Sequence, residues 1–232
     1  MGNKLDDILY EYEMMAHTMS HDLRDPLRQA IIDCDEMHEK DLDEESLSKT
    51  SQIMENINEV IMKIAALREY SYLVNQKKFE ISTIDCNNII KEIQDDLKDD
   101  IEKHNVLISY KDLPEIKGNK EQIKTLFKNL IDNSIKFKSS ETPDIDIKFE
   151  DKGDLWEFEF KDNGIGIEKV YREIVFAIFQ RLTPEIKDGS MGIGLPFCKR
   201  IAKNHGGDVW YKSTNGKGTS FFVTLAKDQA RK

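Results

Sequence analysis

The sequence predicts an α+β protein in two parts, an N-terminal antiparallel helical hairpin followed by a sandwich of helices on one face of a sheet. Three observations predict this class. Apolar residues recur every three or four positions as far as Val74, as they do in amphipathic helices. Beyond Phe79 several short segments instead alternate apolar and polar residues, and turn-forming residues separate them. We therefore place the boundary near residue 78, with domains at 1–78 and 79–232.

The first domain contains two apolar helical stripes joined by an acidic turn. One stripe runs from Leu5 to Met37 and the other from Leu47 to Val74, with EKDLDEES between them. Two long helices with so short a connection form an antiparallel hairpin. Because one hairpin buries both stripes poorly, we predict that two copies form a dimeric four-helix bundle. Packing of the hairpin against the rest of the same chain is the alternative.

The second domain is expected to combine a largely antiparallel sheet with one layer of helices. Alternating patterns predict strands at 79–83, 106–110, 144–150, 155–162, 207–213 and 218–225. Helical spacing predicts helices at about 85–103, about 119–138 and from Gly192 onward. The last two strands are joined by TNGKG, a strong hairpin turn signal.

Composition excludes several classes of protein. With 34 Lys and Arg against 44 Asp and Glu, the net charge is −10, which disfavours nucleic acid and anionic lipid as partners. The longest apolar run, IVFAIF, is too short to cross a bilayer, and no signal peptide is visible, so we expect a cytoplasmic protein without membrane insertion. Cys34, Cys86 and Cys198 are widely spaced in apolar patterns and fit reduced core residues.

One predicted helix, LFKNLIDNSIKFK, carries a polar stripe. Asn129, Asn133 and Lys136 are spaced four and three residues apart, so they project from one face. Burying two carboxamides and an ammonium without partners is costly, so this face meets either solvent or a ligand. From the residues alone, an ordinary solvated face stays open beside a binding role.

Two glycine-rich segments lie further along the chain. In KDNGIGI, Asp162 ends a predicted strand, and Gly164 and Gly166 let the backbone turn tightly beside a ligand. In GIGLPFCKRI, Gly192 and Gly194 open a helix, where free backbone N–H groups form a ready anion site. Each signal is modest alone, because Asp-Asn-Gly is also a plain turn and glycine also begins ordinary helices.

Together these motifs resemble the ATP-binding domain that sensor histidine kinases share with Hsp90 chaperones, type II topoisomerases and MutL proteins. NLIDNSIKF is similar to the asparagine motif of this GHKL, or Bergerat, α/β sandwich, DNGIGI to its first glycine motif and GIGLPFCKRI to its second. VFAIFQRL resembles the phenylalanine motif found in the kinases, and SHDLRDPLR resembles their phosphoacceptor motif. Because five motifs occur in family order, the chain is identified as a sensor histidine kinase.

The resemblance implies a nucleotide site in the second domain. Asp162 would accept a hydrogen bond from the adenine amino group, beside a turn shaped by Gly164 and Gly166. The backbone of Gly192 and Gly194 would hold phosphates under a lid at about residues 183–191.

The same resemblance implies roles for the remaining polar residues of the site. Asn133, together with Asn129, would hold Mg²⁺ on the ATP phosphates, and Lys136 would contact phosphate oxygens. Arg181 matches the arginine that reaches the γ-phosphate or docks on the histidine helix. Phe176 and Phe179 have a simpler interpretation as anchors of the lid.

The phosphoacceptor implied by the resemblance is His21. A neutral imidazole attacks phosphorus, and the histidine reference pKa of about 6.5 makes that form available near neutral pH. Asp22 is placed to hold one ring N–H, which leaves the lone pair of the other nitrogen free. The phosphoryl group would then pass to an aspartate on the receiver domain of a response regulator. The first helix looks like the end of a signalling helix, so an upstream sensor domain outside this chain is expected.

The sequence departs from the family pattern at two positions, and two alternative functions are considered beside the kinase. Ser190 and Met191 stand where the family usually has glycine and threonine, so a degenerate kinase acting as a dimeric scaffold stays open. An ATPase of the chaperone or topoisomerase type would need a glutamate early in the asparagine helix, and the position four before Asn133 is Asn129. Incubation with γ-labelled ATP separates the kinase, the ATPase and the scaffold.

Overall fold

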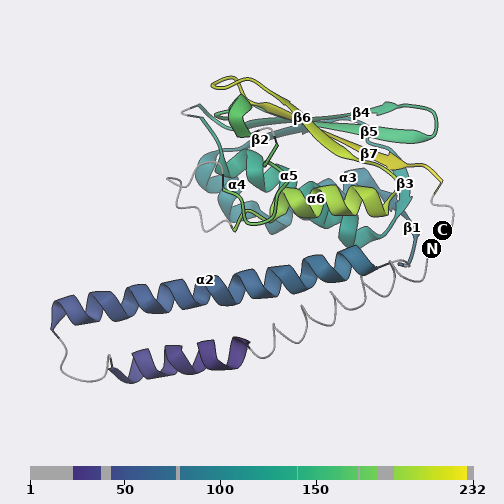
Figure 1. The fold of residues 1–232 in the computed structure, drawn as a ribbon. Coiled ribbons are helices and arrows are strands. Elements are labelled where there is room, and N and C mark those ends of the chain that lie inside the picture. The colour runs from purple at the N-terminus through teal and green to yellow at the C-terminus, as the bar shows by residue number, and fades with distance from the viewer. Residues whose placement is uncertain are drawn as a thin grey trace. The chain divides into compact units, whose positions relative to one another are not determined.

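The computed structural model describes residues 23–37, 43–76, 79–139, 141–171, 173–181 and 191–228 (Figure 1). The chain divides into two compact units, Met1–Gln76 and Lys77–Lys232. That one unit serves phosphotransfer and the other catalysis stays a prediction at this point.

The described residues of the first unit are helical, apart from Asp43 and Gln76, which flank the second helix in extended conformation. Residues 23–37 form a helix, and α2 spans Glu44–Asn75. The α2 helix begins at a side-chain cap, since the Asp43 carboxylate accepts a hydrogen bond from the Ser46 amide at 2.7 Å. The start of the first predicted helix and residues 38–42, which include the first half of the acidic turn, lie outside the described residues. Within the described ranges, no helix combines the length and apolar character that a membrane span requires.

The second unit is built on a mixed sheet of five strands in the order β2-β4-β5-β7-β6. Its strands are β2 (Leu107–Tyr110), β4 (Asp144–Asp151), β5 (Leu155–Asp162), β6 (Val209–Ser213) and β7 (Thr219–Ala226). The β2–β4 pair is parallel and the other pairs are antiparallel. The predicted α+β class is therefore confirmed, with a mixed sheet.

Helices cover one face of this sheet (Figure 1). They are α3 (Cys86–Asp96), α4 (Lys98–His104), α5 (Lys120–Lys136) and α6 (Gly194–Asn204), and a short 3₁₀ turn, η1, spans Lys169–Tyr171. The core forms where α5 meets the sheet: the Phe127 ring lies 5.2 Å from that of Phe158 and 5.0 Å from that of Phe160. All three rings are fully buried. Such burial fixes α5 against β5, and both elements contribute residues to the site described below.

Three local predictions differ from the structure. The helix predicted at 85–103 is two helices that meet at the buried Leu97, and α4 ends at Asn105 in the left-handed conformation. The strand predicted at 79–83 lies later, as β1 (Ser82–Asp85). It pairs with an unpredicted strand, β3 (Glu115–Gly118), in a small antiparallel sheet. The β3 sequence EIKG is too short to carry an alternating apolar pattern.

Candidate functional site

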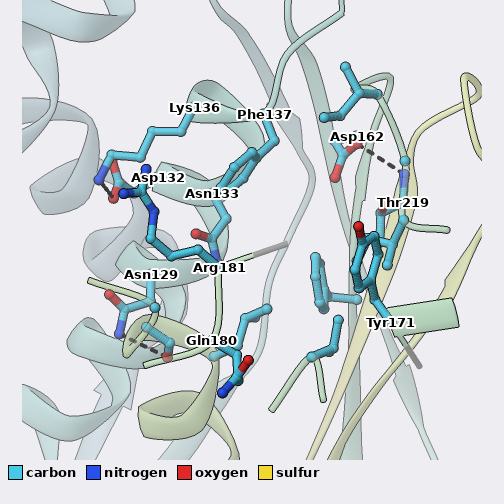
Figure 2. A pocket seen from close by; sticks show the side chains of 18 of the residues that line it. Asn129, Asp132, Asn133, Lys136, Phe137, Asp162, Tyr171, Gln180, Arg181 and Thr219 are labelled. Atoms are coloured by element: carbon cyan, nitrogen blue, oxygen red, sulfur yellow. Dashed lines mark hydrogen bonds and ion pairs between the residues drawn. The ribbon is translucent and has the colours of Figure 1, made fainter. Parts of the chain in front are cut away.

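A cavity of about 490 Å³ lies within the second unit, bounded by α5, the loop after β5, the segment before Arg181 and the start of α6 (Figure 2). Most residues that the sequence predicted for the site line it: Asn129, Asn133, Lys136, Asp162, Gly166, Arg181, Gly192 and Gly194. Gly164 lies beside Asp162 without lining the cavity. The predicted phosphoacceptor His21 and its neighbour Asp22 lie outside the described residues.

Asp162 ends β5 and is 9% exposed. Its Oδ1 atom accepts hydrogen bonds from the backbone amides of Gly164 at 2.8 Å and Thr219 at 3.0 Å. Its Oδ2 atom lies 3.5 Å from the Ser134 hydroxyl, a long contact. Burial raises the pKa of this carboxyl, while the two amides and Ser134 oppose that rise. One carboxylate oxygen is thus held by the backbone, and the other is available to a donor in the cavity.

The loop after Asp162 lies against two other backbone segments. The Ile165 amide donates to the Phe137 carbonyl at 3.0 Å, and the Ile165 carbonyl accepts from Gly216 at 2.7 Å. Gly166 has φ +75, and a Cβ atom there would lie 2.4 Å from the Thr214 carbonyl oxygen. Only glycine fits this approach, which brings the loop from β5 to the wall of the cavity.

The polar stripe of α5 faces the cavity. The Asn129 Nδ2 atom lies 3.5 Å from the Gly194 carbonyl oxygen, and the Lys136 ammonium pairs with Asp132 at 2.6 Å. The Asn133 Nδ2 atom is buried and has no hydrogen-bond partner among the described residues. Such an orphaned group is uncommon in folded proteins, and this one belongs to a residue that lines the cavity. Since amide oxygen and nitrogen can be interchanged by a flip, Asn133 can present an oxygen to a metal ion there.

The α6 helix begins beside this stripe. Gly194 is its first residue, and Ile193 before it provides no side-chain cap. The first N–H groups of the helix are therefore available to an anion in the cavity. The buried Cys198 thiol lies 3.5 Å from the Leu126 carbonyl oxygen, which holds α6 against α5.

Arg181 lines the cavity from the segment that follows η1. That segment is anchored: the Phe179 amide donates to the Gly192 carbonyl at 2.9 Å, and the Phe176 ring lies 6.3 Å from Tyr211. The Phe176 contact is made by its ring, whereas the Phe179 contact is made by its backbone, so the anchoring role of the two phenylalanines stays a prediction. Residues 182–190, which include Ser190 and most of the predicted lid, lie outside the described residues, whereas Met191 lines the cavity.

Sequence reasoning missed several residues of this site. Asp132 could have been found, because it lies four residues before Lys136, the spacing of a helical ion pair. Ser134 follows Asn133 directly but has no sequence signal of its own. Thr219 acts through its backbone amide, and an amide gives no signal in the residue type.

Comparison with protein families places this fold and cavity in one class. Residues 118–229 match the family described as "Histidine kinase-, DNA gyrase B-, and HSP90-like ATPase". The second unit is therefore an ATP-binding domain of that class.

Relatives among curated proteins narrow the class further. Cyanobacterial phytochrome A of a Nostoc species is 32% identical over 219 residues, which cover 93% of this chain and 28% of the relative. The adaptive-response sensory kinase SasA of Prochlorococcus marinus is 29% identical over 220 residues, covering 92% of this chain and 58% of that protein. Over nearly its whole length the chain is therefore similar to sensor histidine kinases, the family that the sequence motifs resemble. It spans well under two thirds of the length of these relatives.

Known structures share the fold across both units. Full-length ShkA in complex with AMPPNP matches with a TM-score of 0.67 at 18% identity, covering 94% of this chain and 47% of ShkA. Histidine kinase ThkA in complex with the response regulator protein TrrA matches with a TM-score of 0.62 at 23% identity, covering 94% and 63%. At these identities the likeness shows the fold alone.

Proposed function

We propose that the chain is the ATP-dependent, autophosphorylating histidine kinase part of a two-component system. It would phosphorylate His21 and transfer the phosphoryl group to an aspartate of a response regulator. The observation that carries the proposal is the cavity, where a buried carboxylate, a carboxamide stripe and an uncapped helix start face one space. The similarity of the chain to sensor histidine kinases supports it.

Asp162 selects the base in this proposal. Its Oδ2 atom accepts a hydrogen bond from the exocyclic amino group of adenine, while the amides of Gly164 and Thr219 keep the carboxylate in place. A guanine ring carries a carbonyl at the corresponding position, which would set two acceptors against each other. Adenine nucleotides are therefore favoured over guanine nucleotides.

The phosphates lie between the start of α6 and the end of α5. The backbone amides at Gly192 and Gly194 donate to phosphate oxygens, and the positive end of the helix dipole adds to the attraction. Lys136 and Arg181 supply side-chain cations on the same cavity. Phosphoryl transfer depends mainly on such positioning and charge neutralisation.

Asn133, together with Asn129, is proposed to hold Mg²⁺ at the phosphates. The buried, unpartnered amide of Asn133 fits this role, because Mg²⁺ takes oxygen ligands and needs few from the protein when phosphates and water supply the others. When bound, the ion neutralises phosphate charge.

The transfer step uses residues of the first unit. The lone pair of a neutral His21 ring nitrogen attacks the γ-phosphorus, an N–P bond forms, and the P–O bond to ADP breaks. Asp22 holds the opposite ring N–H and stabilises the positive charge that develops on the ring. A response-regulator aspartate then accepts the phosphoryl group from the histidine. The complex of the fold relative ThkA with TrrA supports a partner of this kind.

We propose that the first unit dimerises as a four-helix bundle. Support comes from apolar side chains that are left exposed on α2: Ile53, Val60 and Leu67 recur every seven residues and are 47%, 42% and 41% exposed. A seven-residue repeat marks one face of a helix, and an exposed apolar face favours association. The input signal is proposed to come from a sensor domain, since the curated relatives are much longer than this chain.

The test is incubation of the chain with γ-labelled ATP and Mg²⁺. We expect a label that is stable in alkali, lost in acid and absent from His21→Ala, and that moves to a receiver domain when one is added. Release of phosphate without label would indicate an ATPase instead. Nucleotide binding with neither label nor phosphate release would indicate a scaffold.

A further inference from the structure

The phosphate side of the cavity contains a carboxylate that the proposed roles leave unused. Asp132 lines the cavity from α5, one residue before Asn133. Its Oδ2 atom lies 2.6 Å from the Lys136 Nζ atom, and the two side chains are 25% and 32% exposed. Figure 2 shows the Arg181 side chain directed toward the same pair. Asp132 therefore lies among the cations proposed to receive the phosphates.

We propose that Asp132 makes nucleotide binding depend on Mg²⁺, an inference that rests on the proposed function of the cavity. A metal-free triphosphate is highly anionic, and the Asp132 carboxylate repels it at short range. The same carboxylate holds the Lys136 ammonium, so the phosphates of a metal-free nucleotide compete with it for that cation. Partial shielding from water strengthens both effects.

The electrostatic interaction of Asp132 with a metal-bound nucleotide differs from its interaction with a metal-free one. Mg²⁺ reduces the negative charge of the phosphates, and the Asp132 carboxylate attracts the cation. Asp132 and Asn133, the latter proposed as a ligand of the ion, both line the cavity from α5, so the carboxylate lies on the same wall of the cavity as the proposed metal ligand. Asp132 thus disfavours the metal-free nucleotide and favours the metal complex.

Among the described residues that line the cavity, the other carboxylates are Asp162 and Glu168. Asp162 is held by the amides of Gly164 and Thr219, on the opposite side of the cavity in Figure 2. Glu168 follows Gly166 in the loop after β5 and is not part of the α5 stripe. Asp132 is therefore the carboxylate placed to act on the phosphates.

The test is equilibrium binding of AMP-PNP, measured by calorimetry with Mg²⁺ and with EDTA. For the unmodified chain we expect binding to weaken at least about tenfold in EDTA, which corresponds to about 1.4 kcal/mol. For Asp132→Asn we expect tighter binding in EDTA than the unmodified chain shows, and a ratio between the two conditions below about threefold. Asp132→Glu keeps the charge and is expected to keep the tenfold ratio.

Asp96→Asn is the matched control. The Asp96 carboxylate pairs with Lys124 and Lys128, also on α5, at 3.2 and 3.3 Å, but does not line the cavity. In this control the ratio of nucleotide affinities in Mg²⁺ and in EDTA should equal that of the unmodified chain. If thermal melting shows that Asp132→Asn is unfolded, Asp132→Ser takes its place.

The outcomes separate two failures. An Asp132→Asn ratio equal to that of the unmodified chain would overturn this inference alone. Absence of nucleotide binding by the unmodified chain in both conditions would overturn the proposed function, and this inference with it.

Discussion

At the scale of single residues, Asp162 shows how the fold prepares a binding group. A carboxylate that is almost fully buried is disfavoured by lost hydration, and this burial raises its pKa. The amides of Gly164 and Thr219 compensate by holding one oxygen, which fixes the direction of the other. The two amides therefore stabilise the carboxylate in the folded protein, and its second oxygen can still accept a hydrogen bond from a ligand.

Asp162→Asn is predicted to lose adenine nucleotides while staying folded. The remaining amide oxygen can accept from Gly164 and Thr219, which turns the amide NH₂ group toward the cavity and against the adenine amino group. Loss of one hydrogen bond to a charged acceptor costs about 1.5–3 kcal/mol, so affinity should fall by about ten- to a hundredfold. Calorimetry with AMP-PNP measures this, with Asp146→Asn on β4 as the control. Unchanged affinity would contradict the role of Asp162.

His205 is predicted to make the second unit less stable in mild acid. The ring is fully buried, its Nε2 atom accepts from the Asn119 amide at 3.1 Å, and its Nδ1 atom lies 2.8 Å from the Ile201 carbonyl oxygen. Burial lowers the pKa of His205, so the unfolded chain binds a proton first as the pH falls. Stability is thus retained above about pH 7 and lost progressively below the reference pKa of about 6.5.

Urea unfolding between about pH 7.5 and pH 5.5 checks this. A loss of about 1 kcal/mol is expected, because protonation of one histidine in the unfolded chain can lower the free energy of unfolding by at most about 1.4 kcal/mol over this range. His205→Gln should remove most of the pH slope. His104→Gln, at a partly exposed histidine, serves as the control and should keep it. A His205→Gln slope equal to that of the unmodified chain would show that another group is responsible.

At the scale of elements, the helices that carry the site were predictable from their apolar faces. Residues of α5 that the 3.6-residue period assigns to the core are fully buried: Ile123, Leu126, Phe127, Leu130 and Ile131. The break at Leu97 was not predictable, because KEIQDDLKDD contains no glycine or proline to mark it. Leu97 is buried, and the helix is interrupted at this residue. Apolar periodicity predicts which residues of a helix are buried, but it does not predict where the helix is interrupted.

Gly192→Ala is predicted to disturb the connection between α6 and the Arg181 segment. Gly192 has φ +69, and a Cβ atom there would lie 2.4 Å from the Gln180 carbonyl oxygen. The variant meets both the left-handed backbone cost of about 1 kcal/mol and a backbone clash, so nucleotide affinity should fall at least about tenfold. Gly153→Ala is the control that has the backbone cost without the clash. Gly153 also has a positive φ, +78, but a Cβ atom there would have no other atom within 4 Å. Equal affinities of the two variants would show that the close approach at Gly192 does not shape the site.

At the scale of the whole molecule, the exposed α2 face predicts the oligomeric state. Val60→Glu places a charge in the middle of the repeat made by Ile53, Val60 and Leu67, and should convert dimers to monomers. Met62→Glu, on a similarly exposed residue outside the repeat, should leave the dimer intact. Sedimentation velocity separates these outcomes, and nucleotide binding should be unchanged in both variants. A monomeric unmodified chain would contradict the proposed bundle.

The composition of the site was predictable only in part. Spacing placed Asn129, Asn133 and Lys136 on one helix face, but no pattern in the residues brings that face to Asp162 or to Gly194. Family resemblance supplied this convergence, since the three motifs lie far apart in the chain. The ion pair of Asp132 with Lys136 and the amide of Thr219 became visible only in three dimensions.

The central claim is that a nucleotide held at Asp162 gives its terminal phosphoryl group to His21. It is tested most directly by mapping the phosphorylated residue by mass spectrometry at alkaline pH, after incubation with ATP and Mg²⁺. The account predicts one phosphoryl group on the peptide that contains His21, and none in Asp162→Asn. Modification of another residue, or equal modification of His21 in the Asp162→Asn chain, would contradict it.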